Sequence, residues 1–333
     1  MKTQLLTANP ADLRLAGRII AAGGLVAFPT ETVYGLGGDA LNPEAAALIY
    51  EAKGRPSDNP LIVHIAGLRE ASLLAASLPE AFHVLARQFW PGPLTLVVPK
   101  KASVPDATTG GLGTVAIRMP DNPAALELIR LAGTPVAAPS ANLSGRPSPT
   151  CWEHVQADLD GRIDAIIAGE PSTGGIESTV LDLTGPAPLI LRPGLVTPEA
   201  IASALGQPVG YDPAILGPPD SGKAPRAPGM KYRHYAPKAE MIVFKGDREP
   251  VVRAIQARRK REEAAGKKVG VLLYGGDQNQ LIAREFFARL RRMDDRGVDL
   301  ILAAAVASQD SVGFSIMNRM LKAAGYRIEE VSE

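Results

Sequence analysis

A proline-rich stretch divides this chain into two segments that each alternate strand and helix patterns. Six prolines fall between Tyr211 and Pro237, and no apolar periodicity runs through them. Proline fixes its own φ angle and has no N–H to donate, so neither a long helix nor a central strand continues through such a stretch. The sequence therefore predicts one domain over residues 1–210, a linker over 211–238 and a second domain over 239–333.

In the first segment, short apolar runs alternate irregularly with helical patterns. The predicted strands are 25–28, 61–65, 94–98, 114–118, 165–168, 178–183 and 189–191, and the predicted helices are 10–22, 43–53, 79–89, 123–131 and 197–205. Several strand pairs lack a helix between them, which favours a mixed sheet over a purely parallel one. We expect an α/β fold with a twisted mixed sheet and covering helices.

The second segment alternates more regularly. Predicted strands at 241–244, 269–274, 300–304 and 327–331 are separated by predicted helices at 250–265, 279–292 and 310–324. One helix between each pair of strands is typical of parallel sheets with helices on both faces. The pattern predicts a small, Rossmann-like, doubly wound domain.

Composition excludes several classes of protein. The chain has 46% hydrophobic and 21% charged residues, too apolar for a disordered chain, and its formal charge of +1 excludes a strongly basic nucleic-acid coat. The lone Cys151 can form neither a disulfide framework nor a thiolate metal site. The longest apolar run, Leu300–Ala307, is far shorter than the roughly 20 residues that span a bilayer. We expect a soluble, cytoplasmic protein.

Residues 241–333 carry a basic excess, which lies partly in Arg258-Arg259-Lys260-Arg261 within a predicted helix. The interpretation we favour is a solvated helix face. A weak RNA contact is the alternative.

Small hydroxyl and cationic residues gather near the ends of the predicted strands. Pro29–Gly37 follows the first strand directly, where open α/β sheets bind ligands. Lys53 and Arg55 flank Gly54, and in an extended segment both would point the same way, as a polyphosphate site requires. A surface pair of cations is the alternative.

Arg118 and Arg192 each end an apolar strand, where a guanidinium is costly unless it is paired. Arg118 therefore predicts either a carboxylate-binding fork or an internal salt bridge. Ser140 and Asn142 alternate in the same manner as Lys53 and Arg55, and they could donate to phosphate or ribose. Together these residues indicate a cavity for a nucleotide and a carboxylate.

These motifs, in this order, resemble the YrdC-type family in its long, two-domain form. The resemblance is carried by Pro29-Thr-Glu-Thr-Val-Tyr-Gly-Leu36, by Lys53-x-Arg55, by Ser140-x-Asn142 and by the linker run Pro228-Gly-Met-Lys-Tyr-Arg-His-Tyr-Ala-Pro237. It extends from about Leu5 to the end of the chain. It implies a nucleotidyltransferase that makes L-threonylcarbamoyladenylate and pyrophosphate from L-threonine, bicarbonate or CO2, and ATP. That reaction is the first step of tRNA N6-threonylcarbamoyladenosine modification.

The resemblance also implies residue roles. Catalytic positions are Lys53, Arg55, Ser140 and Asn142; ATP-binding positions are Arg55, Asn59, Thr114, Ser140, Ser148, Arg192, Tyr232 and His234; threonine-binding positions are Thr32, His64, Arg118, Ala138 and Ser178. Tyr232 and His234 would close over the site as a lid. Mg²⁺ would enter with ATP, without a dedicated metal site or an organic cofactor, and the product would pass to a transferase acting on tRNA.

Two other functions stay open at this point. One is an RNA-binding protein without catalysis. The other is an enzyme that forms a carbamoyl-adenylate, although a single cysteine excludes the zinc-finger segments that usually accompany it. The linker also departs from the family pattern, with Ala227-Pro228-Gly229 where Ser-Pro-Gly is usual.

Overall fold

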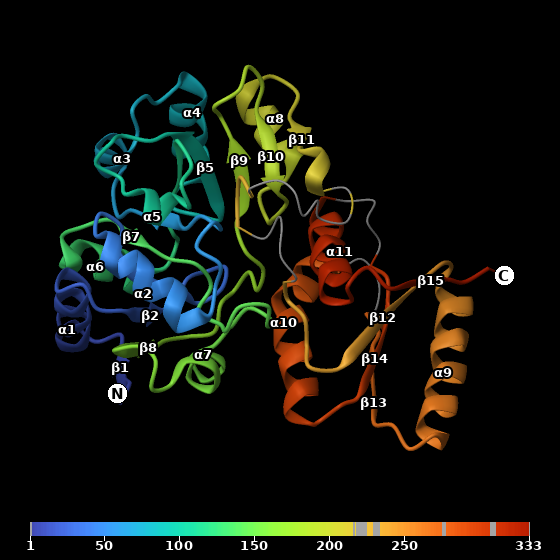
Figure 1. The fold of residues 1–333 in the computed structure, drawn as a ribbon. Helices are drawn as coiled ribbons and strands as arrows, with labels where there is room; N and C mark the ends of the chain where they lie inside the picture. The colour runs from blue at the N-terminus through green and yellow to red at the C-terminus, as the bar shows by residue number, and fades with distance from the viewer. Residues whose placement is uncertain are drawn as a thin grey trace. The chain divides into compact units, whose positions relative to one another are not determined.

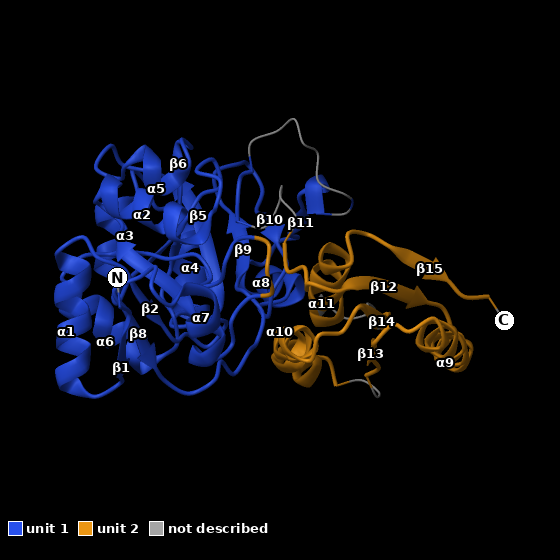
Figure 2. Cartoon of the chain, turned by 60° about the horizontal axis from the view of Figure 1, so that its bottom comes forward, with its two compact units in different colours: residues 1–144, 148–231 blue, residues 145–147, 232–333 orange. Residues whose placement is uncertain are grey.

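The structure is a computed structural model that describes residues 2–215, 217, 225–228, 234–274, 278–306 and 311–332 (Figure 1). The chain forms two compact units, residues 1–144 with 148–231 and residues 145–147 with 232–333 (Figure 2). The division after residue 231 lies within the stretch that the sequence assigns to the linker.

Unit 1 contains an 11-stranded sheet in the order β1-β8-β2-β3-β7-β4-β6-β5-β9-β10-β11. Its pairs are of both kinds: β4–β6 and β5–β9 are parallel, whereas β5–β6 and β9–β10 are antiparallel. The strands are β1 (Gln4–Thr7), β2 (Val26–Phe28), β3 (Gly35–Asp39), β4 (Ile62–His64), β5 (Leu94–Pro99), β6 (Thr114–Arg118), β7 (Val136–Ala137), β8 (Ala165–Ala168), β9 (Thr179–Asp182), β10 (Leu189–Arg192) and β11 (Gly210–Tyr211). The prediction of a mixed sheet is confirmed.

Local signals determine where several helices of unit 1 begin. Proline opens α1, α2, α6 and α8, and the preceding Asn9, Asn42, Asn122 or Thr197 side chain accepts a hydrogen bond from a first-turn amide. The helices are α1 (Pro10–Ala21), α2 (Pro43–Lys53), α3 (Leu68–Leu74), α4 (Glu80–Phe89), α5 (Asp106–Thr109), α6 (Pro123–Ala132), α7 (Trp152–Leu159) and α8 (Pro198–Leu205), with a 3-10 turn at Pro213–Ile215.

The central strands of the sheet are buried on both faces, which explains why most of them are continuously apolar. In β2, Val26 and Phe28 join a cluster with residues of α1 and α6, whereas Ala27 joins the larger cluster that contains residues of α2 and α4. Successive strand residues point to opposite faces, so both faces of β2 need apolar side chains.

Strand β3 is absent from the strands that the sequence predicts. Three of its five residues are glycines, which weaken a strand pattern. The glycines are needed for packing, because a Cβ at Gly37 would lie 2.7 Å from Val136 Cγ1 and 2.8 Å from Phe28 Cε1.

Unit 2 is a parallel four-stranded sheet in the order β13-β14-β12-β15. Its elements are β12 (Glu240–Lys245), α9 (Arg248–Ala264), β13 (Val269–Leu272), α10 (Asn279–Asp295), β14 (Leu300–Ala304), α11 (Ser311–Ala323) and β15 (Ile328–Glu330). The connection through α9 runs across the sheet in the opposite direction to those through α10 and α11. Right-handed crossovers therefore place α9 on one face and the other two helices on the other, as Figure 1 shows. The doubly wound prediction is confirmed.

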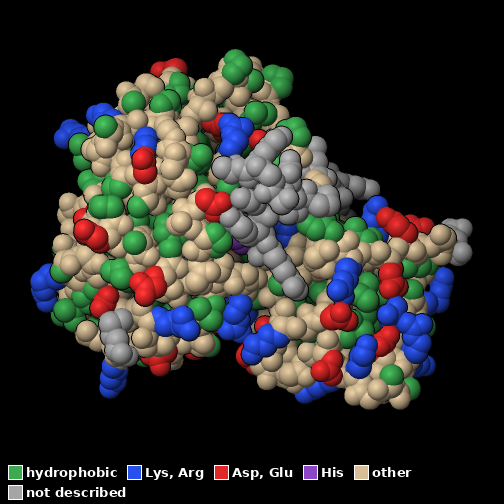
Figure 3. Space-filling view, in the orientation of Figure 1, with side chains coloured by type: hydrophobic (Ala, Val, Ile, Leu, Met, Phe, Trp, Pro, Cys, Tyr) green, Lys and Arg blue, Asp and Glu red, His purple; other side chains and the backbone are tan. Residues whose placement is uncertain are grey.

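The basic run on α9 is largely paired within unit 2. Arg258 contacts Glu262 and Glu329, and Arg259 contacts Glu263 with an Nε–Oε1 distance of 2.8 Å. Cationic and anionic side chains intermingle on the face of this unit that Figure 3 shows. This supports the interpretation of a solvated helix face. Within the described residues, no helix combines the length and the apolar character needed to cross a membrane.

Candidate active site

One edge of the unit 1 sheet collects polar side chains from five neighbouring strands, in the order β4-β6-β5-β9-β10. His64 and Arg118 end the parallel strands β4 and β6 and are register partners. Because β5 runs antiparallel to β6, its early residue Thr95 lies at the same edge, and Ser178 lies just before the paired start of β9. Arg192 ends β10 opposite Val180. The sheet thus brings together residues that are far apart in the sequence.

The Arg118 guanidinium makes three hydrogen bonds within the protein, and only 4% of the side chain is exposed. Its Nη1 donates to Thr32 Oγ1 at 2.9 Å, its Nη2 to Glu31 Oε1 at 2.5 Å, and its Nε to the Gly92 carbonyl at 3.3 Å. Of the two interpretations of Arg118, the internal ion pair is present. Thr32 and Arg118, both assigned to threonine, are in direct contact.

His64 is neutral at physiological pH. Burial, with the nearby Arg118 cation as the smaller cause, lowers the pKa of its imidazole to about 3. Its Nδ1 lies 3.2 Å from the Ile62 carbonyl oxygen, and its ring meets that of Phe28 edge-on. His64 therefore adds no positive charge beside Arg118.

Ser178 connects the two groups of predicted residues. Its Oγ lies 2.8 Å from Thr95 Oγ1 and accepts a hydrogen bond from Arg192 Nη2 at 3.1 Å. Arg192 also donates from Nη1 to the Pro228 carbonyl at 3.4 Å. Ser178 was predicted to bind threonine and Arg192 to bind ATP, so the structure brings one residue from each predicted site into direct contact. Ala138 is buried, and its N–H donates to the carbonyl of Ile62 in β4.

Lys53, Ser140 and Asn142 form a second cluster in unit 1. Lys53 is 2% exposed, and its Nζ donates to the Ser140 and Asn142 carbonyls at 2.5 Å each. Ser140 Oγ in turn donates to Asn142 Oδ1 at 2.5 Å. The Lys53 carbonyl accepts from the Ser144 amide. The end of α2 is thereby attached to the 140–144 loop, and three of the four predicted catalytic residues lie together.

The extended geometry expected for Lys53 and Arg55 is wrong. Lys53 is the last residue of α2, and Gly54 terminates the helix in the left-handed conformation with φ 59°. Arg55 then turns to its own loop, where Nη2 donates to the Asn59 carbonyl at 3.2 Å and to the Pro60 carbonyl at 3.0 Å. The helix cap decides the geometry, because glycine adopts positive φ without steric cost.

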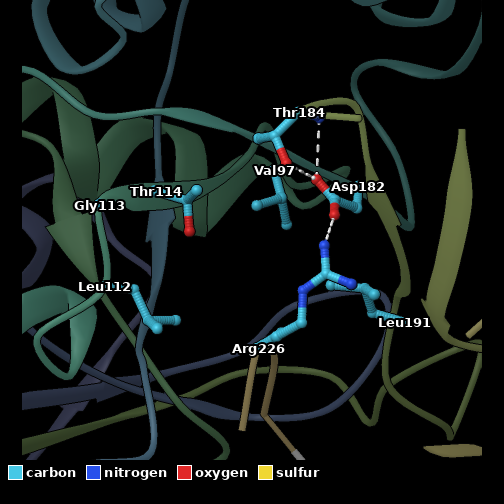
Figure 4. Close-up of a pocket in the computed structure, with 8 residues that line it drawn as sticks. All are labelled: Val97, Leu112, Gly113, Thr114, Asp182, Thr184, Leu191 and Arg226. Carbon is cyan, nitrogen blue, oxygen red and sulfur yellow. Dashed lines mark hydrogen bonds and ion pairs between the residues drawn. The ribbon is translucent and has the colours of Figure 1, made fainter. Parts of the chain in front are cut away.

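Ser148 and Thr114 lie in other surroundings. Ser148 Oγ donates to Glu177 Oε1 at 2.5 Å, with both residues buried. Thr114 begins β6, at the opposite end from Arg118, roughly 13 Å away along the strand. It lines a cavity of about 220 Å³ with Asp182 and Arg226, which form an ion pair (Figure 4). The structure does not bring Thr114 next to Arg118.

The linker residues complete the predicted set. Tyr232 lies outside the described residues. His234 belongs to unit 2, is 9% exposed and has its ring centroid 5.6 Å from that of Tyr235. The lid stays a prediction.

Three polar residues of these clusters were not selected from the sequence: Glu31, Thr95 and Glu177. Glu31 stands inside the Pro29–Leu36 motif and Glu177 directly precedes Ser178, so each is followed by a hydroxyl residue. Thr95 is the single polar side chain in an apolar strand. Such isolated polar residues in buried segments are the signal that could have found them.

A family model for Sua5, YciO and YrdC proteins, described as telomere recombination, matches residues 18–194, and one described as the threonylcarbamoyl-AMP synthase C-terminal domain matches residues 196–325. A threonylcarbamoyl-AMP synthase of Pyrococcus abyssi is 50% identical and one of Bacillus subtilis 46% identical. These alignments cover 96% and 98% of this chain, and 96% of each relative.

A solved structure shares the fold. The crystal structure of P. abyssi Sua5 complexed with L-threonine matches with a TM-score of 0.94 and 48% identity, over 99% of this chain and 100% of that chain. The match extends through both the mixed-sheet unit and the parallel-sheet unit. The chain therefore belongs to the Sua5/YciO/YrdC family, in the form that carries the Sua5 C-terminal domain.

Proposed function

We propose that this protein is a nucleotidyltransferase that forms L-threonylcarbamoyladenylate and pyrophosphate from L-threonine, bicarbonate or CO2, and ATP. The observation that carries the proposal is the 50% identity, over almost the whole of both chains, to a relative named threonylcarbamoyl-AMP synthase. In this reaction the threonine amine is carboxylated, and an oxygen of the resulting carbamate attacks the α-phosphate while pyrophosphate leaves.

The sheet edge around Arg118 would bind threonine. A guanidinium can hold a carboxylate through two parallel hydrogen bonds. Thr32 and Ser178 present hydroxyl groups within the same network, and buried Ala138 and the neutral His64 would complete the walls. The rigid register of β4 and β6 would hold these groups in place, and positioning of this kind is the main contribution in such chemistry.

The Lys53 cluster would act on the nucleotide. Lys53 and Arg55 would offset the charge that develops on the phosphates, and Ser140 and Asn142 would orient them. Asn59, Ser148, Thr114 and Arg192, with Tyr232 and His234 of the linker, would complete the ATP site. No three His, Cys, Asp or Glu side chains in the described parts of the chain lie together as metal ligands. We propose that Mg²⁺ enters on the phosphate oxygens of ATP.

The product is a mixed anhydride, so a downstream transferase acting on tRNA would have to consume it. We place that sequence of reactions in the cytoplasm. The alternative of a non-catalytic RNA-binding protein finds no support in a basic run that is largely ion-paired, and neither relative is named as a carbamoyl-adenylate-forming enzyme.

The test is pyrophosphate release from ATP and bicarbonate, with and without L-threonine, beside L-serine and glycine. We expect release that depends on threonine and is much weaker with the two controls. Folded protein that releases no pyrophosphate with any amino acid would contradict the proposal.

A further inference from the structure

We propose that Glu31 recognises the α-ammonium group of the amino-acid substrate, so that the Glu31–Arg118 pair binds the two charges of a free α-amino acid. This inference rests on the proposed function and assigns one more residue to its amino-acid site.

The two oxygens of the Glu31 carboxylate have different surroundings. Oε1 accepts from Arg118 Nη2 at 2.5 Å. Oε2 is buried and has no hydrogen-bond partner among the residues that the structure describes. The side chain as a whole is 11% exposed. One oxygen thus holds the arginine, and the other has lost its water without a replacement, which is unfavourable for a carboxylate.

The hydroxyl groups of Thr30 and Thr32, the two neighbours of Glu31 in the sequence, form hydrogen bonds with other groups. Thr30 Oγ1 donates to the Val33 carbonyl at 2.6 Å and lies 2.9 Å from Thr32 Oγ1. Thr32 Oγ1 accepts from Arg118. Both threonines next to Glu31 are therefore engaged in the turn itself, and neither donates to Oε2, which leaves this oxygen able to accept from a ligand.

The balance of charge around Arg118 indicates that the group donating to Glu31 Oε2 is a cation. Arg118 already balances one carboxylate, that of Glu31, and His64 beside it is neutral. A substrate carboxylate on the same guanidinium introduces a second anion, which needs a cation of its own. The α-ammonium of an amino acid is adjacent to its carboxylate, so it reaches Glu31 while the carboxylate reaches Arg118.

The experiment compares L-threonine with (R)-3-hydroxybutanoate, which lacks only the amino group. Calorimetry on the full chain without ATP would give both dissociation constants for the wild type, for Glu31→Gln and for the control Glu127→Gln. Glutamine keeps an oxygen for Arg118 but removes the negative charge. Glu127 is an exposed partner of Arg130 outside the site.

We expect wild type and Glu127→Gln to prefer L-threonine by on the order of 10- to 100-fold, and Glu31→Gln to lose most of that preference. In the pyrophosphate assay Glu31→Gln should raise KM for threonine by a similar factor and leave KM for ATP within about twofold. A merely structural role would weaken both ligands equally.

An unchanged preference in folded Glu31→Gln overturns the inference. If that variant does not fold, the two dissociation constants of the wild type provide the test. Equal affinity of the wild type for L-threonine and (R)-3-hydroxybutanoate also overturns the inference. The proposed function fails separately: a wild type that prefers threonine yet releases no pyrophosphate supports the role of Glu31 in a different reaction.

Discussion

Two arginine–glutamate pairs in this protein share the same chemistry and differ in burial. In unit 1, the Arg118–Glu31 pair has side chains that are 4% and 11% exposed, and it lies at the edge where β4, β6 and β10 end and β5 and β9 begin. In unit 2, the Arg259–Glu263 pair has side chains that are 52% and 41% exposed, one turn apart on α9. The first pair has lost most of its water, whereas the second keeps it.

The difference in burial separates the pair that we propose as part of the threonine site from a pair on the surface. Removing one partner of a buried pair leaves a charge without compensation, whereas an exposed charge returns to solvent. We propose that the Arg118–Glu31 pair is retained despite its desolvation cost because the amino-acid substrate uses it. Exposed pairs on a helix contribute little to stability and keep the surface charge mixed.

The largest expected effect comes from Arg118→Ala. This change leaves Glu31 buried without its partner, and the free energy of unfolding should fall by about 3–5 kcal/mol. The proposed threonine carboxylate also loses its guanidinium, so pyrophosphate release should fall by at least about 1,000-fold. Urea denaturation and the pyrophosphate assay measure the two effects. Near-normal turnover would remove Arg118 from the site.

A second test replaces Lys53, whose ammonium group donates to two backbone carbonyls. Lys53→Met leaves buried acceptors of the 140–142 loop unsatisfied, at about 1–3 kcal/mol, and should reduce pyrophosphate release by roughly 100-fold. The matched control is Lys101→Met. Lys101 also donates to a carbonyl, that of Ser72 at 2.6 Å, but on the surface. Equal losses in the two variants would contradict the distinction between buried and exposed cations.

The pH dependence of stability offers a third test. The pKa of His64 is about 3 in the folded protein and near 6.5 in the unfolded chain, so the unfolded chain binds a proton first as the pH falls. Stability should therefore fall as the pH drops below about 6.5, by up to about 1.4 kcal/mol per pH unit. In His64→Gln, the free energy of unfolding should no longer show this dependence on pH between about pH 6 and 5. The exposed His83→Gln serves as the control, and an identical slope in both variants contradicts the assignment.

The smallest effect is expected from Arg259→Ala. Its ion pair is exposed and spans one helical turn, so unfolding should change by less than about 1 kcal/mol and pyrophosphate release not at all. Added salt should remove even this difference, because exposed pairs are screened. A large loss would show that burial is not what separates the two pairs.

Much of the fold was predictable because its signals are local. Proline after an asparagine or threonine cap marked the starts of α1, α2, α6 and α8, and the regular alternation of unit 2 predicted a doubly wound sheet. The glycines of β3 and the two-residue strands β7 and β11 carry no such signal, because neighbouring strands alone stabilise them.

The residue types of the site can be read directly in the sequence: cations at the ends of strands and of one helix, hydroxyl residues beside them and glycines between. Which of these side chains meet depends on the assembled sheet. Lys53 contacts Ser140 and Asn142, which lie about 90 residues further along the chain. Arg118 donates to Thr32 and Glu31, whereas Thr114 lies at the other end of β6 from Arg118. The physical reason is that the strand order and direction of a mixed sheet are set by long-range burial, which no local pattern in the chain records.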